Sequence, residues 1–209
     1  PGHYQSARED QILFSKPLPI VGEIQLAQIF SDLSTWIPKD AIITNGAGNF
    51  ATWVHRFYRY GGFKTQLAPV NGSMGYGLPA AIAAKMTYPN RCVICVAGDG
   101  DFMMNSQELA TAMRYGIKII VLILNNGMFG TIRMHQEREY KSRISGTNLT
   151  NPNFVQLAAS YHMLGFQIKK TEQFQAAFQE ALASSQGSII ELVTDPEAIT
   201  PTKRLSELS

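Results

Sequence analysis

Two short polar motifs could hold a metal ion, because each directly follows an apolar run. Gly98-Asp99-Gly100 follows the run from Cys92 to Ala97, and Asn125-Asn126 follows the run from Ile119 to Leu124. Short apolar runs rich in β-branched residues predict buried strands. If these strands are parallel, their carboxyl ends meet at one edge of the sheet. The Asp99 carboxylate and the Asn126 amide would then share a crevice, as hard oxygen ligands suited to Mg²⁺.

Two glycine-rich turns suit a phosphate-bearing ligand. One is Asn45 to Asn49, after the apolar run from Ala41 to Thr44, and the other is Asn71 to Gly77, before an Ala-rich stretch. Such turns present backbone N–H groups to anions. No acidic residue lies between Asp40 and Asp99. The same stretch contains five basic residues: Arg56, Arg59, Lys64, Lys85 and Arg91.

The first turn also fits a different ligand. Gly46, Gly48 and Ala51 match the dinucleotide pattern G-x-G-x-x-A after an apolar strand. A nicotinamide dinucleotide site would need an acidic residue about 20 positions later, on the ribose hydroxyls, and the acid-free stretch covers that window. An NAD-binding oxidoreductase domain is therefore a less favoured alternative. A non-catalytic relict of a cofactor-binding domain is another.

The elements that must position these residues alternate between strand and helix patterns. Strands are predicted at 41–44, 92–97, 119–124, 164–168 and 188–193, and helices at 24–33, after 49, and at 78–86, 106–115, 152–161 and 172–183. The order predicts an α/β fold: a single doubly wound domain with a mostly parallel five- or six-stranded sheet flanked by helices. We expect a polar leader or linker at 1–22, the domain at 23–194 and a tail at 195–209. Residues 128–143 look polar, basic and irregular.

Composition excludes several classes of protein. With 209 residues, 45% of them hydrophobic, the chain is not disordered, and its net charge of +2 gives no reason to expect nucleic acid as a partner. No apolar run reaches the roughly 18 residues of a membrane span, and the N-terminus lacks a signal peptide, so we expect a cytoplasmic location. Because Cys92 and Cys95 are three apart on a strand, their sulfurs should point to opposite faces and form neither redox pair nor zinc site.

Together the two polar motifs resemble the thiamine diphosphate fingerprint, in which Gly-Asp-Gly is followed, one strand later, by Asn-Asn at the end of a hydrophobic run. From Leu26 to Val193 the chain resembles the C-terminal, diphosphate-binding (PP) domain of acetolactate synthase-like enzymes that depend on thiamine diphosphate. The resemblance implies Mg²⁺ held by Asp99, Asn126 and the main-chain oxygen of Met128.

The resemblance also implies where thiamine diphosphate binds. Gly72-Ser73-Met74-Gly75 is similar to the family's Gly-Thr-Met-Gly, in which the Met wedges beneath the cofactor and bends it, while the carbonyl of the first Gly accepts a hydrogen bond from the cofactor's amino group. Met74 and Gly72 would take these roles. The full set of implied cofactor-binding residues is Gly48, Asn49, Phe50, Gly72, Ser73, Met74, Gly98, Gly100, Asp101, Phe102 and Phe129.

The implied function is that of a thiamine diphosphate-dependent lyase or transferase, a decarboxylase or carboligase acting on a 2-oxo acid. In the family the catalytic glutamate lies on a separate N-terminal pyrimidine-binding domain, usually of a neighbouring subunit. Because this chain begins at Pro1 and shows no such segment, we expect a fragment, inactive alone, of a homodimeric or homotetrameric enzyme, and we assign it no catalytic residue. Arg133 and His135 either read the substrate carboxylate or belong to a solvated basic helix.

Overall fold

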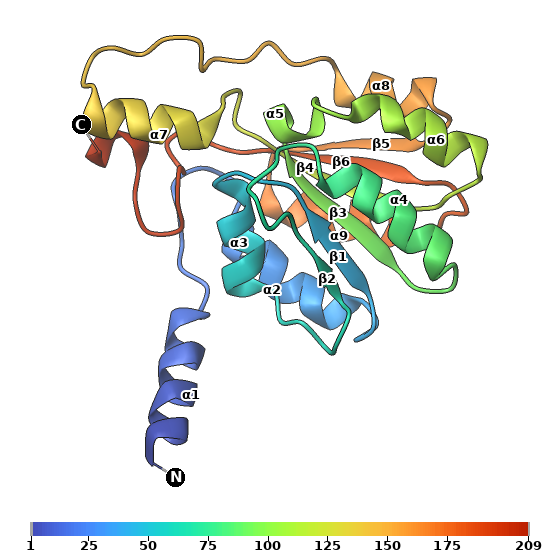
Figure 1. Cartoon of the computed structure of the whole chain (residues 1–209), viewed down its shortest axis with the longest axis horizontal. Helices are drawn as coiled ribbons and strands as arrows, with labels where there is room; N and C mark the ends of the chain where they lie inside the picture. The colour runs from blue at the N-terminus through green and yellow to red at the C-terminus, as the bar shows by residue number, and fades with distance from the viewer. Residues whose placement is uncertain (1, 209) are drawn as a thin grey trace.

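Six parallel strands form the centre of the protein in the computed structural model, which describes residues 2–208 (Figure 1). The strands are β1 (Ile42–Asn45), β2 (Gln66–Leu67), β3 (Val93–Gly98), β4 (Ile120–Asn125), β5 (Leu164–Ile168) and β6 (Ser188–Val193). Their order across the sheet is β2-β1-β3-β4-β6-β5, and every pairing is parallel. The predicted α/β class and parallel sheet are confirmed.

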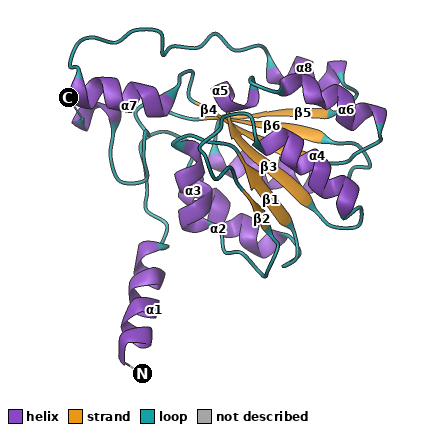
Figure 2. Ribbon diagram, viewed as in Figure 1, coloured by secondary structure: helices purple, strands orange, loops and turns teal. Residues whose placement is uncertain are grey.

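Helices cover both faces of the sheet, which gives three layers (Figure 2). One face packs against α2 (Leu26–Trp36), α3 (Phe50–Phe57) and α9 (Phe174–Ala183), and the other against α4 (Gly77–Thr87), α6 (Leu109–Arg114) and α8 (Phe154–Ser160). Successive side chains of a strand point to opposite faces. In β3, Ile94 and Val96 therefore join the first core, whereas Val93, Cys95 and Ala97 join the second.

The two cysteines lie on opposite faces, as the strand register predicts. Cys92 packs against the core that contains α2, and Cys95 is buried in the core that contains α4. Both thiols are free. The prediction that the two sulfurs lie on opposite faces of the sheet is confirmed.

The expected polar leader contains a helix, α1 (Gly2–Phe14), none of whose residues is buried. The helix projects away from the sheet (Figure 1). Arg56 holds its end: the guanidinium donates a 2.8 Å hydrogen bond to the Phe14 carbonyl and lies 4.1 Å from the centre of the Phe14 ring. Between residues 2 and 208, no helix combines the length and apolar character that crossing a membrane requires.

Part of the segment predicted to be irregular is helical. Helix α7 (Gly130–Glu139) has no buried residue, so it lacks the apolar stripe that makes a helix visible in a sequence. Arg133 and Glu137, one turn apart, form a 2.8 Å ion pair on it. The irregular structure predicted for residues 130–139 was therefore wrong, because a helix without fully buried residues gives no apolar period in the sequence.

The segment after β6 folds back beside the start of α7. Ile199 and Leu205 are buried and form a small cluster with Met128. The remaining short elements are α5 (Asp99–Phe102), η1 (Ser106–Glu108), η2 (Thr171–Gln173) and η3 (Leu205–Glu207). The C-terminal segment thus contacts the loop that follows β4, which brings it to the site described next.

Candidate functional site

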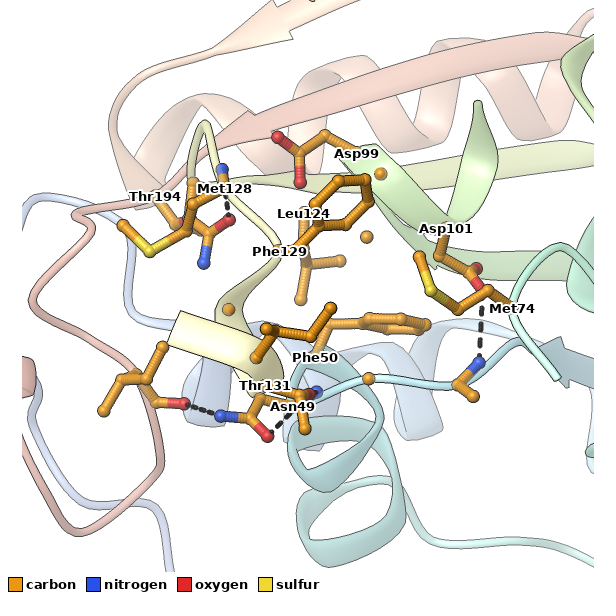
Figure 3. Close-up of a pocket in the computed structure, with 18 of the residues that line it drawn as sticks. Asn49, Phe50, Met74, Asp99, Asp101, Leu124, Met128, Phe129, Thr131 and Thr194 are labelled. Atoms are coloured by element: carbon orange, nitrogen blue, oxygen red, sulfur yellow. Dashed lines mark hydrogen bonds between the residues drawn. The ribbon is translucent and has the colours of Figure 1, made fainter. Parts of the chain in front are cut away.

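A cavity of about 470 Å³ opens at the carboxyl ends of β1, β3 and β4 (Figure 3). β2 pairs on one side of β1, and β3 pairs on the other. The chain therefore reverses its direction of progress across the sheet between β1 and β3. Ligands of open α/β sheets bind at such a reversal. The crevice expected from the sequence is present at this position.

Most of the predicted site residues line this cavity. The lining includes Gly48, Asn49, Phe50, Gly72, Met74, Gly98, Asp99, Gly100, Asp101, Asn126, Met128 and Phe129. Two predicted residues do not contribute to it. The Ser73 hydroxyl turns to the Asn71 side chain at 2.8 Å, and the Phe102 ring is buried in the core against Phe154. The Phe102 ring is therefore closed to a ligand, and the Ser73 N–H also donates to Asn71 Oδ1, at 3.3 Å.

Further lining residues were not among the predicted site residues, although Ala47 lies in the first glycine-rich turn. They are Leu26, Ala47, Trp53, Leu124, Gly130, Thr131, Ile132, Thr194, Ala198 and Ile199. Thr131 and Ile132 lie in α7, whose helix was not predicted. Thr194, Ala198 and Ile199 follow β6, where no pattern indicated structure. Thr131 lies five residues after Asn126, and this closeness in sequence to a predicted metal ligand could have indicated it.

Asp99 is buried with one carboxylate oxygen already bound. Oδ2 accepts hydrogen bonds from the Gly127 backbone N–H at 3.0 Å and from Asn151 Nδ2 at 2.7 Å. Burial raises the pKa of this carboxyl, and the hydrogen bonds from Asn151 and from the Gly100 and Gly127 backbone oppose that rise. Oδ1 receives neither of the two bonds made to Oδ2.

The loop after β4 is shaped by its own backbone and by the segment 147–149. The Met128 N–H donates to Asn126 Oδ1 at 3.2 Å. The Phe129 N–H donates to the Thr147 carbonyl at 2.9 Å, and the Leu149 N–H donates to the Gly127 carbonyl at 2.8 Å. Gly127 has a φ of +70°, which a glycine adopts without strain. These bonds fix the loop that carries two of the predicted metal ligands.

The donor set at this edge fits a hard cation. Asp99 and Asn126 offer carboxylate and amide oxygens, and Met128 offers a carbonyl. Within residues 2–208 no group of three or more His, Cys, Asp and Glu side chains converges on one point. Mg²⁺ does not need such a group, because it takes remaining ligands from water and substrate phosphates. The residues present therefore fit Mg²⁺ together with a diphosphate.

Asp101 joins the two glycine-rich turns. Its Oδ1 accepts hydrogen bonds from the Ala47 N–H at 3.1 Å and the Gly75 N–H at 2.9 Å. A Cβ at Gly46 would collide with this carboxylate, so glycine permits the approach. Oδ2 is buried without a partner, and burial raises the pKa of Asp101 to about 6. Asp101 thus holds the turns together as well as lining the cavity.

Two aromatic rings lie against the glycines of the Gly98-Asp99-Gly100 motif (Figure 3). A Cβ at Gly98 would lie 2.8 Å from the Phe50 ring, and one at Gly100 would lie 2.5 Å from the Phe129 ring. Both distances are too short for real side chains. The two glycines therefore let Phe50 and Phe129 form walls of the cavity at close range to the backbone.

The first turn is also tied to α7 and to the C-terminal segment. The Thr131 hydroxyl donates to Asn49 Oδ1 at 2.9 Å and accepts from the Asn49 N–H at 2.9 Å. Asn49 Nδ2 donates to the Ile199 carbonyl at 3.2 Å. Figure 3 shows these bonds at one side of the cavity. Three segments distant in sequence thus meet at Asn49.

Arg133 and His135 do not line the cavity. Arg133 pairs with Glu137 at 2.8 Å and contacts Asn148 at 3.4 Å. The His135 ring lies 3.0 Å from the Arg138 guanidinium. His135 is thus exposed on α7, whereas Arg133 is half-buried in its ion pair, so the structure fits neither interpretation for both residues.

Comparisons with known proteins agree with this geometry. Residues 46–192 match the family model described as "Thiamine pyrophosphate enzyme, C-terminal TPP binding domain", pyrophosphate being a synonym of diphosphate. An acetolactate synthase of Arthrospira platensis is 36% identical over 165 residues, which are 78% of this chain and 28% of that protein. The large subunit of acetolactate synthase isozyme 2 of Escherichia coli K12 is 32% identical over 169 residues, 80% of this chain and 31% of that subunit.

A solved structure has the same fold. The thiamine diphosphate-dependent 4-hydroxybenzoylformate decarboxylase of Rhodococcus jostii RHA1 superposes with a TM-score of 0.79 at 29% identity, covering 87% of this chain and 34% of that one. The chain thus spans about a third or less of the length of the relatives described here.

Proposed function

Since the chain belongs to the family of C-terminal TPP-binding domains of thiamine pyrophosphate enzymes and is similar to acetolactate synthases, we propose that it binds Mg²⁺ and thiamine diphosphate in a 2-oxo acid decarboxylase or carboligase. One observation carries the proposal. The oxygen donors of Asp99, Asn126 and Met128 line the same cavity as both glycine-rich turns.

Each part of the cavity has a proposed task. Asp99 Oδ1, Asn126 Oδ1 and the Met128 carbonyl hold Mg²⁺, which neutralises the diphosphate. The backbone of Gly98, Gly100 and Gly48 leaves room for the phosphates. Phe102 would act through its backbone alone, since its ring is buried in the core, and Ser73 does not line the cavity.

The organic part of the cofactor would lie between the second turn and the aromatic rings. Met74 lines the cavity and is half-buried, which suits the wedge beneath the bent cofactor, and the Gly72 carbonyl would accept the amino hydrogen bond. When bound, thiamine diphosphate supplies a nucleophilic carbon and an electron sink for cleaving the bond next to a carbonyl group. Phe50 and Phe129 would exclude water from that carbon, and Asp101 would hold both turns in place.

The complete active site needs more than this chain. We propose that the catalytic glutamate comes from an N-terminal pyrimidine-binding domain of a neighbouring subunit, in a homodimer or homotetramer, and that the chain alone is inactive. The short coverage of its relatives supports this. The cytoplasmic location stays a prediction, which the two free cysteines support.

The geometry of the first turn argues against the NAD alternative. The Ala47 N–H, which a dinucleotide pyrophosphate would need, already donates to the Asp101 carboxylate. A second anion at that place would meet like charge. No acidic residue lies within about 20 positions after the turn to hold ribose hydroxyls.

The experiment that tests the proposal compares three ligands in the presence of Mg²⁺: thiamine diphosphate, thiamine monophosphate and thiamine. Isothermal titration should show affinity falling in that order, because the diphosphate is the part whose charge Mg²⁺ would neutralise. Equal affinity for thiamine and its diphosphate would contradict the proposed site. If the chain binds thiamine diphosphate but stays inactive with an added N-terminal domain, the result would instead support the alternative of a non-catalytic relict.

A further inference from the structure

A chain of polar side chains runs behind Asp99, through the sheet, to its edge. It joins Gln167 in β5, Glu191 in β6, Asn125 at the end of β4, Asn151, and Asp99 after β3. Gln167 Nε2 donates to Glu191 Oε2 at 2.9 Å, and Asn125 Nδ2 donates to Glu191 Oε1 at 2.7 Å. Asn151 Nδ2 lies 3.0 Å from Asn125 Oδ1 and 2.7 Å from Asp99 Oδ2.

Glu191 determines which side chains donate and which accept along this series of hydrogen bonds. Glu191 is only 4% exposed, and its strand, β6, lies inside the sheet between β4 and β5. An ionised carboxylate accepts hydrogen bonds and cannot donate them, so the amide NH₂ of Asn125 must face Glu191. The Asn125 carbonyl oxygen then faces the other way, where it accepts from the Gly127 N–H at 3.0 Å and from Asn151 Nδ2.

The orientation of Asn125 determines that of Asn151, which in turn holds Asp99. Because Asn125 presents an oxygen to Asn151, the Asn151 NH₂ group turns toward both Asn125 Oδ1 and Asp99 Oδ2. Asp99 Oδ2 is held a second time by the Gly127 N–H. A flipped Asn125 would instead bring its NH₂ against the Gly127 N–H and its oxygen against Glu191, two repulsive contacts.

We propose that Glu191 is a positioning residue, which acts through Asn125 and Asn151 to hold Asp99 with Oδ1 toward the metal. The inference rests on the proposed function of the site. Burying a carboxylate is costly unless its hydrogen bonds are made, and those of Glu191 end on amides rather than on a cation. Residues that orient a metal ligand commonly change metal affinity when they are substituted.

The test measures the affinity of the 209-residue chain for thiamine diphosphate at graded Mg²⁺ concentrations, by isothermal titration. Glu191→Gln keeps the shape, but its amide can donate or accept, so Asn125 is free to flip. We expect the Mg²⁺ concentration for half-maximal affinity to rise roughly tenfold or more. Affinity measured in EDTA should stay unchanged. Asn151→Leu removes the donor to Asp99 and should have the same effect.

A double variant separates positioning from general structure. In Glu191→Gln with Asn125→Asp, the carboxylate moves to position 125. The new amide at position 191 donates to this carboxylate and still accepts from Gln167. Each hydrogen bond between positions 167, 191, 125 and 151 then has a donor and an acceptor again. Asn125→Asp alone places two carboxylates face to face and should lower affinity. The double variant should therefore bind Mg²⁺ better than either single variant, a coupling that a double-mutant cycle measures.

Two matched controls lie close by. Asn153 has the same residue type as Asn151, on the same loop, but accepts from the Gln156 N–H as the cap of α8. Asn153→Ala should lower the melting temperature, because the cap of α8 is lost, and leave the Mg²⁺ dependence unchanged. Ser188→Ala alters the other end of β6, where the buried hydroxyl has no partner, and should change neither.

The outcomes are distinguishable. If the unaltered chain shows no Mg²⁺-dependent affinity, the proposed function fails and this inference with it. If the unaltered chain binds but Glu191→Gln needs no more Mg²⁺, only the inference is overturned. It is likewise overturned if the controls lose Mg²⁺ dependence in proportion to their melting temperatures, or if the double variant is no better than both single ones.

Discussion

Asp99 and Asp101, one glycine apart on the same turn, meet different surroundings and take different roles. Asp99 has one oxygen held by Gly127 and Asn151, and its other oxygen is the one that we propose for a metal. Asp101 accepts hydrogen bonds from Ala47 and Gly75 with one oxygen. Its other oxygen is buried and has no hydrogen-bond partner among residues 2–208. The motif and its spacing singled out Asp99 as a metal ligand, which stays a prediction. The role of Asp101 as a clamp depends on two turns that only the fold brings together.

Removing the charge of Asp99 should abolish the dependence on Mg²⁺. Asp99→Asn keeps the size of the side chain but offers a metal an uncharged ligand, and charged contacts are worth about 1.5–3 kcal/mol. The affinity for thiamine diphosphate in Mg²⁺ should fall roughly tenfold or more, measured by isothermal titration. Asp40→Asn, at an exposed carboxylate beside Arg91, is the control and should bind normally. Unchanged affinity in Asp99→Asn would remove this residue from the metal site.

Asp101 should make stability depend on pH. Its pKa is raised from 3.8 to about 6 by burial. Well below pH 3.8 the carboxyl is protonated in both the folded and the unfolded chain, and burial of the neutral acid is tolerated. As pH rises toward 6, the unfolded chain releases the proton first, so folded stability is lost, by at most about 3 kcal/mol.

Asp101→Asn isolates that effect, since the amide stays neutral and can still accept from Ala47 and Gly75. The difference in unfolding free energy between the variant and the unaltered protein should grow in favour of the variant from pH 4 to pH 7. Urea denaturation at several pH values measures it. Parallel curves over this range would show that Asp101 is not buried as described.

At the scale of elements, the strands and helices that could be predicted were those with an apolar pattern in the sequence. Strands β3 and β4 are fully apolar runs and were placed within one or two residues. β2 has two residues, both exposed, and gave no pattern. Helix α7 and the segment after β6 were missed because their contact with the site uses Thr131, Asn49 and Ile199, one residue at a time. Such contacts leave no periodic trace in a sequence.

The C-terminal segment should be held mainly by Ile199, which is 1% exposed beside Met128. Ile199→Ala leaves a cavity there, so unfolding free energy should fall by about 2–5 kcal/mol. The loosened segment should also become sensitive to proteolysis. Ile144→Ala, at a residue 41% exposed, is the matched control and should cost less than about 0.5 kcal/mol. Equal effects of the two substitutions would mean that the segment does not pack on the site.

At the scale of the whole molecule, the topology determines where the site lies. The reversal of strand order between β1 and β3 brings the first turn and the Gly98-Asp99-Gly100 motif to one crevice. The predicted parallel sheet implied this crevice, although the sequence could not give the strand order. The chain spans about a third or less of its relatives. The crevice supplies the metal and diphosphate half of the proposed active site.

The most direct measurement is isothermal titration of thiamine diphosphate into the protein in Mg²⁺ and, separately, in EDTA, with NAD as a parallel ligand. Binding of thiamine diphosphate in Mg²⁺, much weaker binding in EDTA and none of NAD would support the site at Asp99, Asn126 and Met128. Equal binding with and without Mg²⁺, no binding of thiamine diphosphate, or binding of NAD in its place would contradict it.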